Sequence, residues 1–210
     1  MNPFAFLCRK RSAEQRAAQG LRAELQPLQP VYPPRRLSLP ALSDDYPRVT
    51  SLEAHGLGAY LLSAHLDAQA LAQVEQLIEQ QEFLKSRQTG VFRTLSQSGS
   101  EGDSVSLQGE PLGEGISVVL VSNSISLLQA LPGLAPPAPW QVFPEVDAET
   151  LGSLQGNLAH WWQNYWWPYW QSLDPKQRKQ WFENPAHPQD WCDYLKLQDA
   201  LNGNDTEVGA

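Results

Sequence analysis

The sequence predicts an α+β protein, in which a small antiparallel sheet with an amphipathic helix is followed by a Trp-rich, all-helical C-terminal part. Residues 66–87 repeat apolar side chains at the helical period. Residues 91–121 hold short apolar or alternating runs separated by Gly and Ser, a pattern typical of antiparallel strands. Beyond the prolines of 132–139 the chain becomes strongly aromatic and loses strand-like alternation.

These shifts in composition divide the 210 residues into four predicted parts. An N-terminal helix and a Pro-rich extended arm occupy 1–50, and an α+β body occupies 51–135. A Trp-rich helical part packed on the body covers 136–202, and a disordered tail covers 203–210. A chain of this length buries roughly 70% of its unfolded surface, so it can form a core without disulfides.

The first part begins with a short helix over 12–26, which Ser12 is expected to cap. Six prolines then fall between positions 27 and 47. Proline lacks a backbone donor and disrupts both helices and central strands. We therefore expect 27–50 to be extended, as an arm on the body.

The body opens with a buried strand over 58–66, a short apolar and aromatic run. Asp67 then suits a helix N-cap. The residues that follow place apolar side chains on one face and glutamines on the other, which predicts an amphipathic helix over 68–87.

Three further strands follow the helix, at 91–95, 105–107 and 116–121. The glycines of 109–115 indicate a turn between the last two strands. A short helix is expected to follow, capped by Ser122, Asn123 or Ser124 and running through Leu131. Because short turns join these strands, we expect them to pair antiparallel.

The third part looks wholly helical over 145–201. Asp147 is expected to cap a helix beginning at residue 148. The pair Asp174–Pro175 indicates the start of a second helix, since proline suits the first helical position. A third helix is expected from Pro188 to about Leu201.

Five of the eight tryptophans of the chain lie within ten residues, 161–170. In one continuous helix from residue 148, Trp161 and Trp162 share a face with two tyrosines and four leucines. Trp166 falls at the edge of that face, whereas Trp167 and Trp170 point away from it. Two such rings in water would form a large apolar patch, so something is expected to cover them.

Three arrangements could shield these tryptophan rings from water. Pro168 could break the helix and fold the rings back into the core. Other helices or the arm could sandwich them, or a partner could cover them, because aromatics are enriched at binding hot spots. The third possibility makes Trp166, Trp167 and Trp170 the candidate partner-binding residues.

Charge narrows the range of partners. The chain carries 15 basic and 23 acidic residues, and the acids are concentrated beyond residue 48. Such a body repels nucleic-acid phosphate, so we expect no nucleic acid among its partners. The expected partner is another protein, possibly basic, or a second copy of the chain. No run is long enough to span a bilayer, and two cysteines without metal spacing favour the cytoplasm.

The sequence offers no catalytic, phosphate-binding or zinc motif, so no catalytic residue, cofactor or metal is assigned. An enzyme whose pocket lies between the body and the Trp-rich helices remains an alternative, with His160, His187 and Cys192 as its polar groups. A metal site at Glu183, His187, Asp190 and Asp193 is a weaker possibility, because acids at a helix start also complement its dipole.

We therefore predict a non-enzymatic protein-binding protein of the inhibitor or immunity, chaperone or adaptor type, acting through an acidic, aromatic-rich surface. A peripheral membrane contact through residues 4–11 is a further alternative, because Phe4, Phe6 and Leu7 precede a basic cluster.

Overall fold

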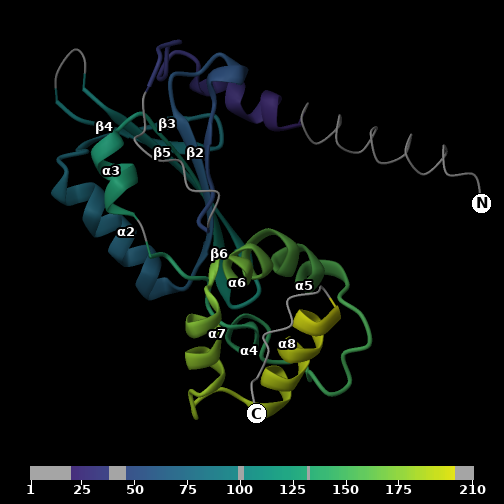
Figure 1. Cartoon of the computed structure of the whole chain (residues 1–210). Coiled ribbons are helices and arrows are strands. Elements are labelled where there is room, and N and C mark those ends of the chain that lie inside the picture. The colour runs from purple at the N-terminus through teal and green to yellow at the C-terminus, as the bar shows by residue number, and fades with distance from the viewer. Residues whose placement is uncertain (1–19, 38–45, 99–101, 132, 202–210) are drawn as a thin grey trace, which may run out of the picture.

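The computed structural model describes residues 20–37, 46–98, 102–131 and 133–201, and the rest of the chain lies outside this description. Its fold is α+β, built on one six-stranded antiparallel sheet in the order β1-β2-β6-β5-β4-β3 (Figure 1). The strands are β1 (Val49–Ser51), β2 (Tyr60–Leu66), β3 (Lys85–Thr89), β4 (Phe92–Ser96), β5 (Ser104–Leu112) and β6 (Gly115–Ser122).

Helices α2 and α3 lie against one face of the sheet, and helices α4 to α8 gather at one end of it (Figure 1). The α-helices are α2 (Ala68–Gln80), α3 (Ile125–Ala130), α4 (Pro139–Val142), α5 (Gly156–Trp161), α6 (Trp167–Ser172), α7 (Pro175–Phe182) and α8 (Gln189–Leu201). A π-helix, η3 (Trp162–Trp166), joins α5 to α6, and two short 3-10 turns are η1 (Gln26–Leu28) and η2 (Glu53–His55).

The two faces of the sheet are covered by different parts of the chain. Alternate residues of β2, such as Leu62 and Ala64, pack with Val74 and Ile78 of α2 on what we call the helix face. The opposite face, the segment face, packs against Leu28 and other apolar residues of 20–37. The predicted antiparallel pairing of successive strands is confirmed by the registers of β3 with β4, β4 with β5 and β5 with β6.

Helix α2 begins as predicted and ends earlier. The Asp67 carboxylate accepts a hydrogen bond from the backbone N–H of Ala70 at 2.7 Å, as an N-cap does. The helix stops at Gln80, and Glu82 follows with a φ of 62°, in the left-handed region. The predicted helix over 68–87 is therefore wrong in its last turns, where the chain reverses and forms edge strand β3.

The turn predicted at 109–115 is also shorter than expected, because β5 continues to Leu112 and β6 starts at Gly115. Strand β4 pairs only with residues 104–107 of β5. The far half of β5 therefore has a neighbour on one side only, and Pro111 fits there without breaking a central strand.

The N-terminal segment, residues 20–37, is packed rather than simply extended. Residues 20–25 are helical, which agrees with the end of the predicted helix over 12–26. Tyr32 is buried, donates a hydrogen bond to the carbonyl of Val121 at 2.8 Å and lies 2.9 Å from the Ser106 hydroxyl. The prediction of an extended arm over 27–50 is wrong at its start, where η1 forms a 3-10 turn, whereas strand β1 at its end is extended. Residues 4–11, the candidate membrane contact, lie outside the described residues.

The C-terminal part is helical, but its first helix starts late. Residues 147–155 form turns, and α5 begins at Gly156, so the helix predicted from residue 148 is wrong there. Asp147 instead accepts a hydrogen bond from the backbone N–H of Glu149. The predicted start at Asp174–Pro175 is confirmed by a capping box at α7, and α8 covers the predicted third helix.

Candidate functional site

The Trp-rich segment changes its helical register in the middle. At η3 the backbone N–H of Trp167 donates to the carbonyl of Trp162, five residues back, instead of four. The side-chain amide of Asn164 donates to the carbonyl of His160 at 2.7 Å, which satisfies a helix carbonyl at the change of register. The chain passes Pro168 in this way and stays helical, so the possible helix break at that proline does not occur.

This register change places rings in the core that a straight helix would leave outside. One additional residue in a turn rotates everything after it by about 100°. Trp166 and Trp170 are 1% and 0% exposed, and they stack with Trp161 in a column of three nearly parallel indoles. The prediction that Trp170 points outwards is therefore wrong, and Trp166 also lies inside rather than at an edge.

Polar contacts hold Trp170 in place. Its indole N–H donates to the carboxylate of Asp199 on α8 at 2.8 Å, and both side chains are buried. Arg178 of α7 lies over the ring, donates to the Trp170 carbonyl at 3.1 Å and approaches Asp199 to 3.8 Å. These contacts join α6, α7 and α8 and give this tryptophan a structural task.

None of the eight tryptophans is fully exposed, and all of them lie in the described residues. Trp140, Trp167 and Trp181 are half-buried, and Trp167 stacks on Trp162. Of the three candidate partner-binding residues, Trp167 alone keeps part of its ring on the surface. The core of the C-terminal part, together with its neighbouring helices, covers most of the aromatic excess.

The three residues of the enzyme alternative are not joined by any hydrogen bond that the structure contains. Cys192 is buried, and this burial raises the pKa of its thiol, which disfavours the reactive thiolate. In the tautomer that carries its hydrogen on Nδ1, the His187 ring donates a hydrogen bond from Nδ1 to the carbonyl of Trp181. Its Nε2 accepts a hydrogen bond from the side-chain amide of Asn184. His160 is exposed and contacts Asn164. Each histidine thus has a local structural role.

A fourth histidine, His65 of β2, lies between the sheet and the Trp-rich helices. Its ring is completely buried, contacts Trp161 and Tyr165, and has no hydrogen-bond partner at either nitrogen. Burial without a partner lowers the pKa of His65 to about 4, so the ring is neutral at pH 7. Gly115 leaves room for it, because a Cβ there would lie 2.3 Å from Nε2.

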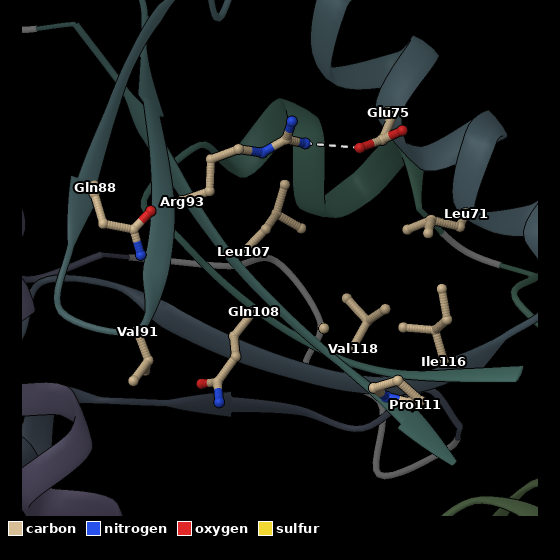
Figure 2. A pocket seen from close by; sticks show the side chains of 11 residues that line it. Leu71, Glu75, Gln88, Val91, Arg93, Leu107, Gln108, Pro111, Ile116 and Val118 are labelled. Atoms are coloured by element: carbon tan, nitrogen blue, oxygen red, sulfur yellow. Dashed lines mark hydrogen bonds and ion pairs between the residues drawn. The ribbon is translucent and has the colours of Figure 1, made fainter. Parts of the chain in front are cut away.

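A groove of about 410 Å³ lies on the helix face of the sheet (Figure 2). We call it the sheet groove. Leu71 and Glu75 of α2 form one wall, and the β3–β4 hairpin forms the other with Gln88, Val91 and Arg93. Its floor consists of residues from the two central strands, namely Leu107, Gln108, Gly109, Pro111, Ile116 and Val118.

The step in the sheet explains this groove. Because β4 ends against Leu107, no strand covers the outer edge of β5 from Gly109 onwards. A Cβ on Gly109 would approach Ile116 to 3.1 Å, so the missing side chain deepens the floor. Val91, at the tip of the β3–β4 hairpin, is 54% exposed beside it. These residues carry no local sequence signal of a site, and the glycines of 109–115 indicate a turn rather than the continuation of β5.

The sheet groove is lined mainly by apolar side chains, with one ion pair among its lining residues. Figure 2 shows Arg93 reaching to Glu75 above the apolar side chains of Leu107 and Val118, and their charged atoms lie 2.7 Å apart. This pair neutralises the two ionisable side chains that line the groove. The lining contains no histidine, cysteine, serine or threonine, and its one carboxylate, Glu75, is paired with Arg93, so it supplies mainly apolar contact.

A second hollow of about 330 Å³ lies between the N-terminal segment and η2, with Arg22 and His55 among its lining residues. In the part of the chain that the structure describes, no three His, Cys, Asp or Glu side chains gather closely enough to hold a metal ion. The same residues include no helix of the length and apolar character that crossing a bilayer requires. Comparison with protein-family models, curated proteins and solved structures finds no match to this chain.

Proposed function

We propose that this chain is a non-enzymatic protein-binding protein and that the sheet groove is its binding surface. The observation that carries the proposal is an apolar groove left open on the helix face, beside the exposed side chain of Val91. Grooves lined by apolar side chains with a few polar groups at the rim are typical of binding sites. A partner that buries Val91 and the groove floor gains hydrophobic stabilisation.

The proposal moves the binding surface away from the Trp-rich helices. Trp166 and Trp170 have no exposed ring to offer, whereas Trp167 keeps a half-buried one. Protein binding of the inhibitor, chaperone or adaptor type suits a mainly apolar groove better than catalysis does. A cytoplasmic location belongs to the same proposal, because Cys192 is a free thiol.

Site-specific photocrosslinking in the native organism tests the proposal. Benzoylphenylalanine replaces Gln88, an exposed residue of the groove wall, and in a matched control it replaces Gln180, an exposed residue of α7. We expect irradiation to give a discrete protein adduct from position 88 and none from position 180. The adduct should disappear when Val91→Asp is added, since a carboxylate on this exposed side chain weakens apolar contact without disturbing the core.

Two results would refute the groove as the binding surface. Equal adducts from positions 88 and 180 would mean unspecific contact. A position-88 adduct that is insensitive to Val91→Asp would place the contact outside the groove.

A further inference from the structure

The outer edge of β3 is open beside the sheet groove. Strand β3 is the last strand of the sheet and pairs with β4 on one side only. No backbone hydrogen bond joins its other side to any described residue. Four of its five residues are exposed. An edge strand of this kind presents a row of backbone donors and acceptors to which another extended segment can pair.

The side chains of β3 differ in character between the two faces. Arg87 lies opposite Thr94, and Thr89 lies opposite Phe92, whose ring packs on the segment face. Lys85 and Arg87 therefore project on the segment-face side, and neither forms an ion pair with a described residue. Ser86 and Gln88 project on the helix-face side, and Gln88 lines the sheet groove.

We infer that the partner binds by adding an extended segment to β3, with acidic and apolar residues in alternation. This inference rests on the proposed function and names the recognition mode of the same site. Residues of the added strand opposite Lys85 and Arg87 are acidic, because opposite charges on directly paired residues stabilise a sheet. Residues of the added strand on the helix-face side are apolar and pack beside Gln88, on the outer side of the hairpin that forms the groove wall. The mode is strand addition, in which backbone bonds give affinity and alternate side chains give specificity.

Local charge outweighs net charge at this edge. The chain as a whole carries a net charge of −8, which favours approach by a basic protein. However, charges more than about 10 Å apart are largely screened at physiological salt. The two basic side chains that directly face an added strand therefore decide which sequence is accepted, and they favour acids.

A second copy of the chain is a poorer occupant. If two β3 strands paired antiparallel around their centres, Arg87 of one copy would face Arg87 of the other. A shift of register by two residues would bring Lys85 opposite Arg87. Like charges directly opposite one another destabilise a strand pair. Self-association through this edge is thus disfavoured.

Fluorescence anisotropy with two labelled octapeptides tests the inference on the full-length chain. One probe is acetyl-(Glu-Val)4-amide and the other is acetyl-(Lys-Val)4-amide. We expect the Glu-Val peptide to bind more tightly. The double substitution Lys85→Glu/Arg87→Glu should weaken its binding about tenfold and strengthen that of the Lys-Val peptide. This exchange of preference requires a folded protein, so loss of structure cannot imitate it.

The matched control is Lys176→Glu/Lys179→Glu on α7, which changes the net charge equally on exposed side chains. It should change the affinity for either peptide less than twofold. A Glu-Val peptide that is N-methylated at alternate residues keeps its charge but loses the donors of one edge. It should fail to bind if backbone pairing is the mode of recognition.

The outcomes separate this inference from the proposed function. Failure of the Glu-Val peptide to bind, undiminished binding of the methylated peptide, or equal effects of the two charge reversals would each overturn strand addition. The groove itself is tested independently by the position-88 adduct and its sensitivity to Val91→Asp. Sedimentation of the chain as a dimer, with loss of that dimer on Lys85→Glu/Arg87→Glu, would show that a second copy of the chain binds the β3 edge. This result would also overturn the inference.

Discussion

Acidification is expected to destabilise this protein through His65. The folded-state pKa of this residue is lowered from 6.5 to about 4, because its ring is buried without a hydrogen-bond partner. Between these two values the unfolded chain binds the proton and the folded chain does not, so stability rises with pH. The contribution is complete above pH 6.5 and is lost progressively as the pH falls towards 4. At pH 5 the loss amounts to about 2 kcal/mol.

Urea unfolding followed by tryptophan fluorescence at pH 7.5 and pH 5.0 measures this loss as a change in the free energy of unfolding. The control is His65→Leu, which cannot titrate and removes two unpartnered ring nitrogens. Other histidines and carboxylates titrate equally in both proteins, so the difference between their pH dependences isolates His65. Parallel loss of stability in wild type and His65→Leu would refute a buried, neutral imidazole at this position.

Two further predictions concern packing. Trp170→Ala removes a core ring, so it should lower the free energy of unfolding, measured by urea titration, by about 3–5 kcal/mol. Trp161→Ala should cost as much, and Trp167→Ala, which removes a half-buried ring, should cost less. Equal costs for Trp167→Ala and Trp170→Ala would contradict the assigned burial. Gly115→Ala should destabilise by about 1–3 kcal/mol, because its Cβ meets the His65 ring. The cost should shrink in a His65→Ala background, and a double-mutant cycle without coupling would show that the two do not touch.

Local signals were enough to predict the elements that depend on local chemistry. Asp67, Ser124 and Asp174 each cap the helix that was expected to begin after them. The β-branched run in β6 and the short turns predicted antiparallel strands, because a buried strand shows its apolar content in sequence. Such features are encoded within a few residues of one another.

Elements that depend on distant neighbours were not predictable in the same way. Residues 85–89 are polar on both faces because β3 is an edge strand, so periodicity could not separate them from the preceding helix. A helical wheel assumes a constant register and so could not show the change of register at η3. That change determines on which face of the helix the Trp170 ring lies. The sheet groove arises where β4 ends against β5, and strand length within a sheet is a property of the assembled fold.

The anchoring of Tyr32 sets an order for folding during synthesis. Its hydroxyl contacts partners 74 and 89 residues later in the chain, on β5 and β6. Residues 20–37 leave the ribosome long before the strands that bury them have been made. Their apolar side chains therefore stay exposed to solvent until β6 has been synthesised. During this period the nascent chain can misassociate or bind chaperones.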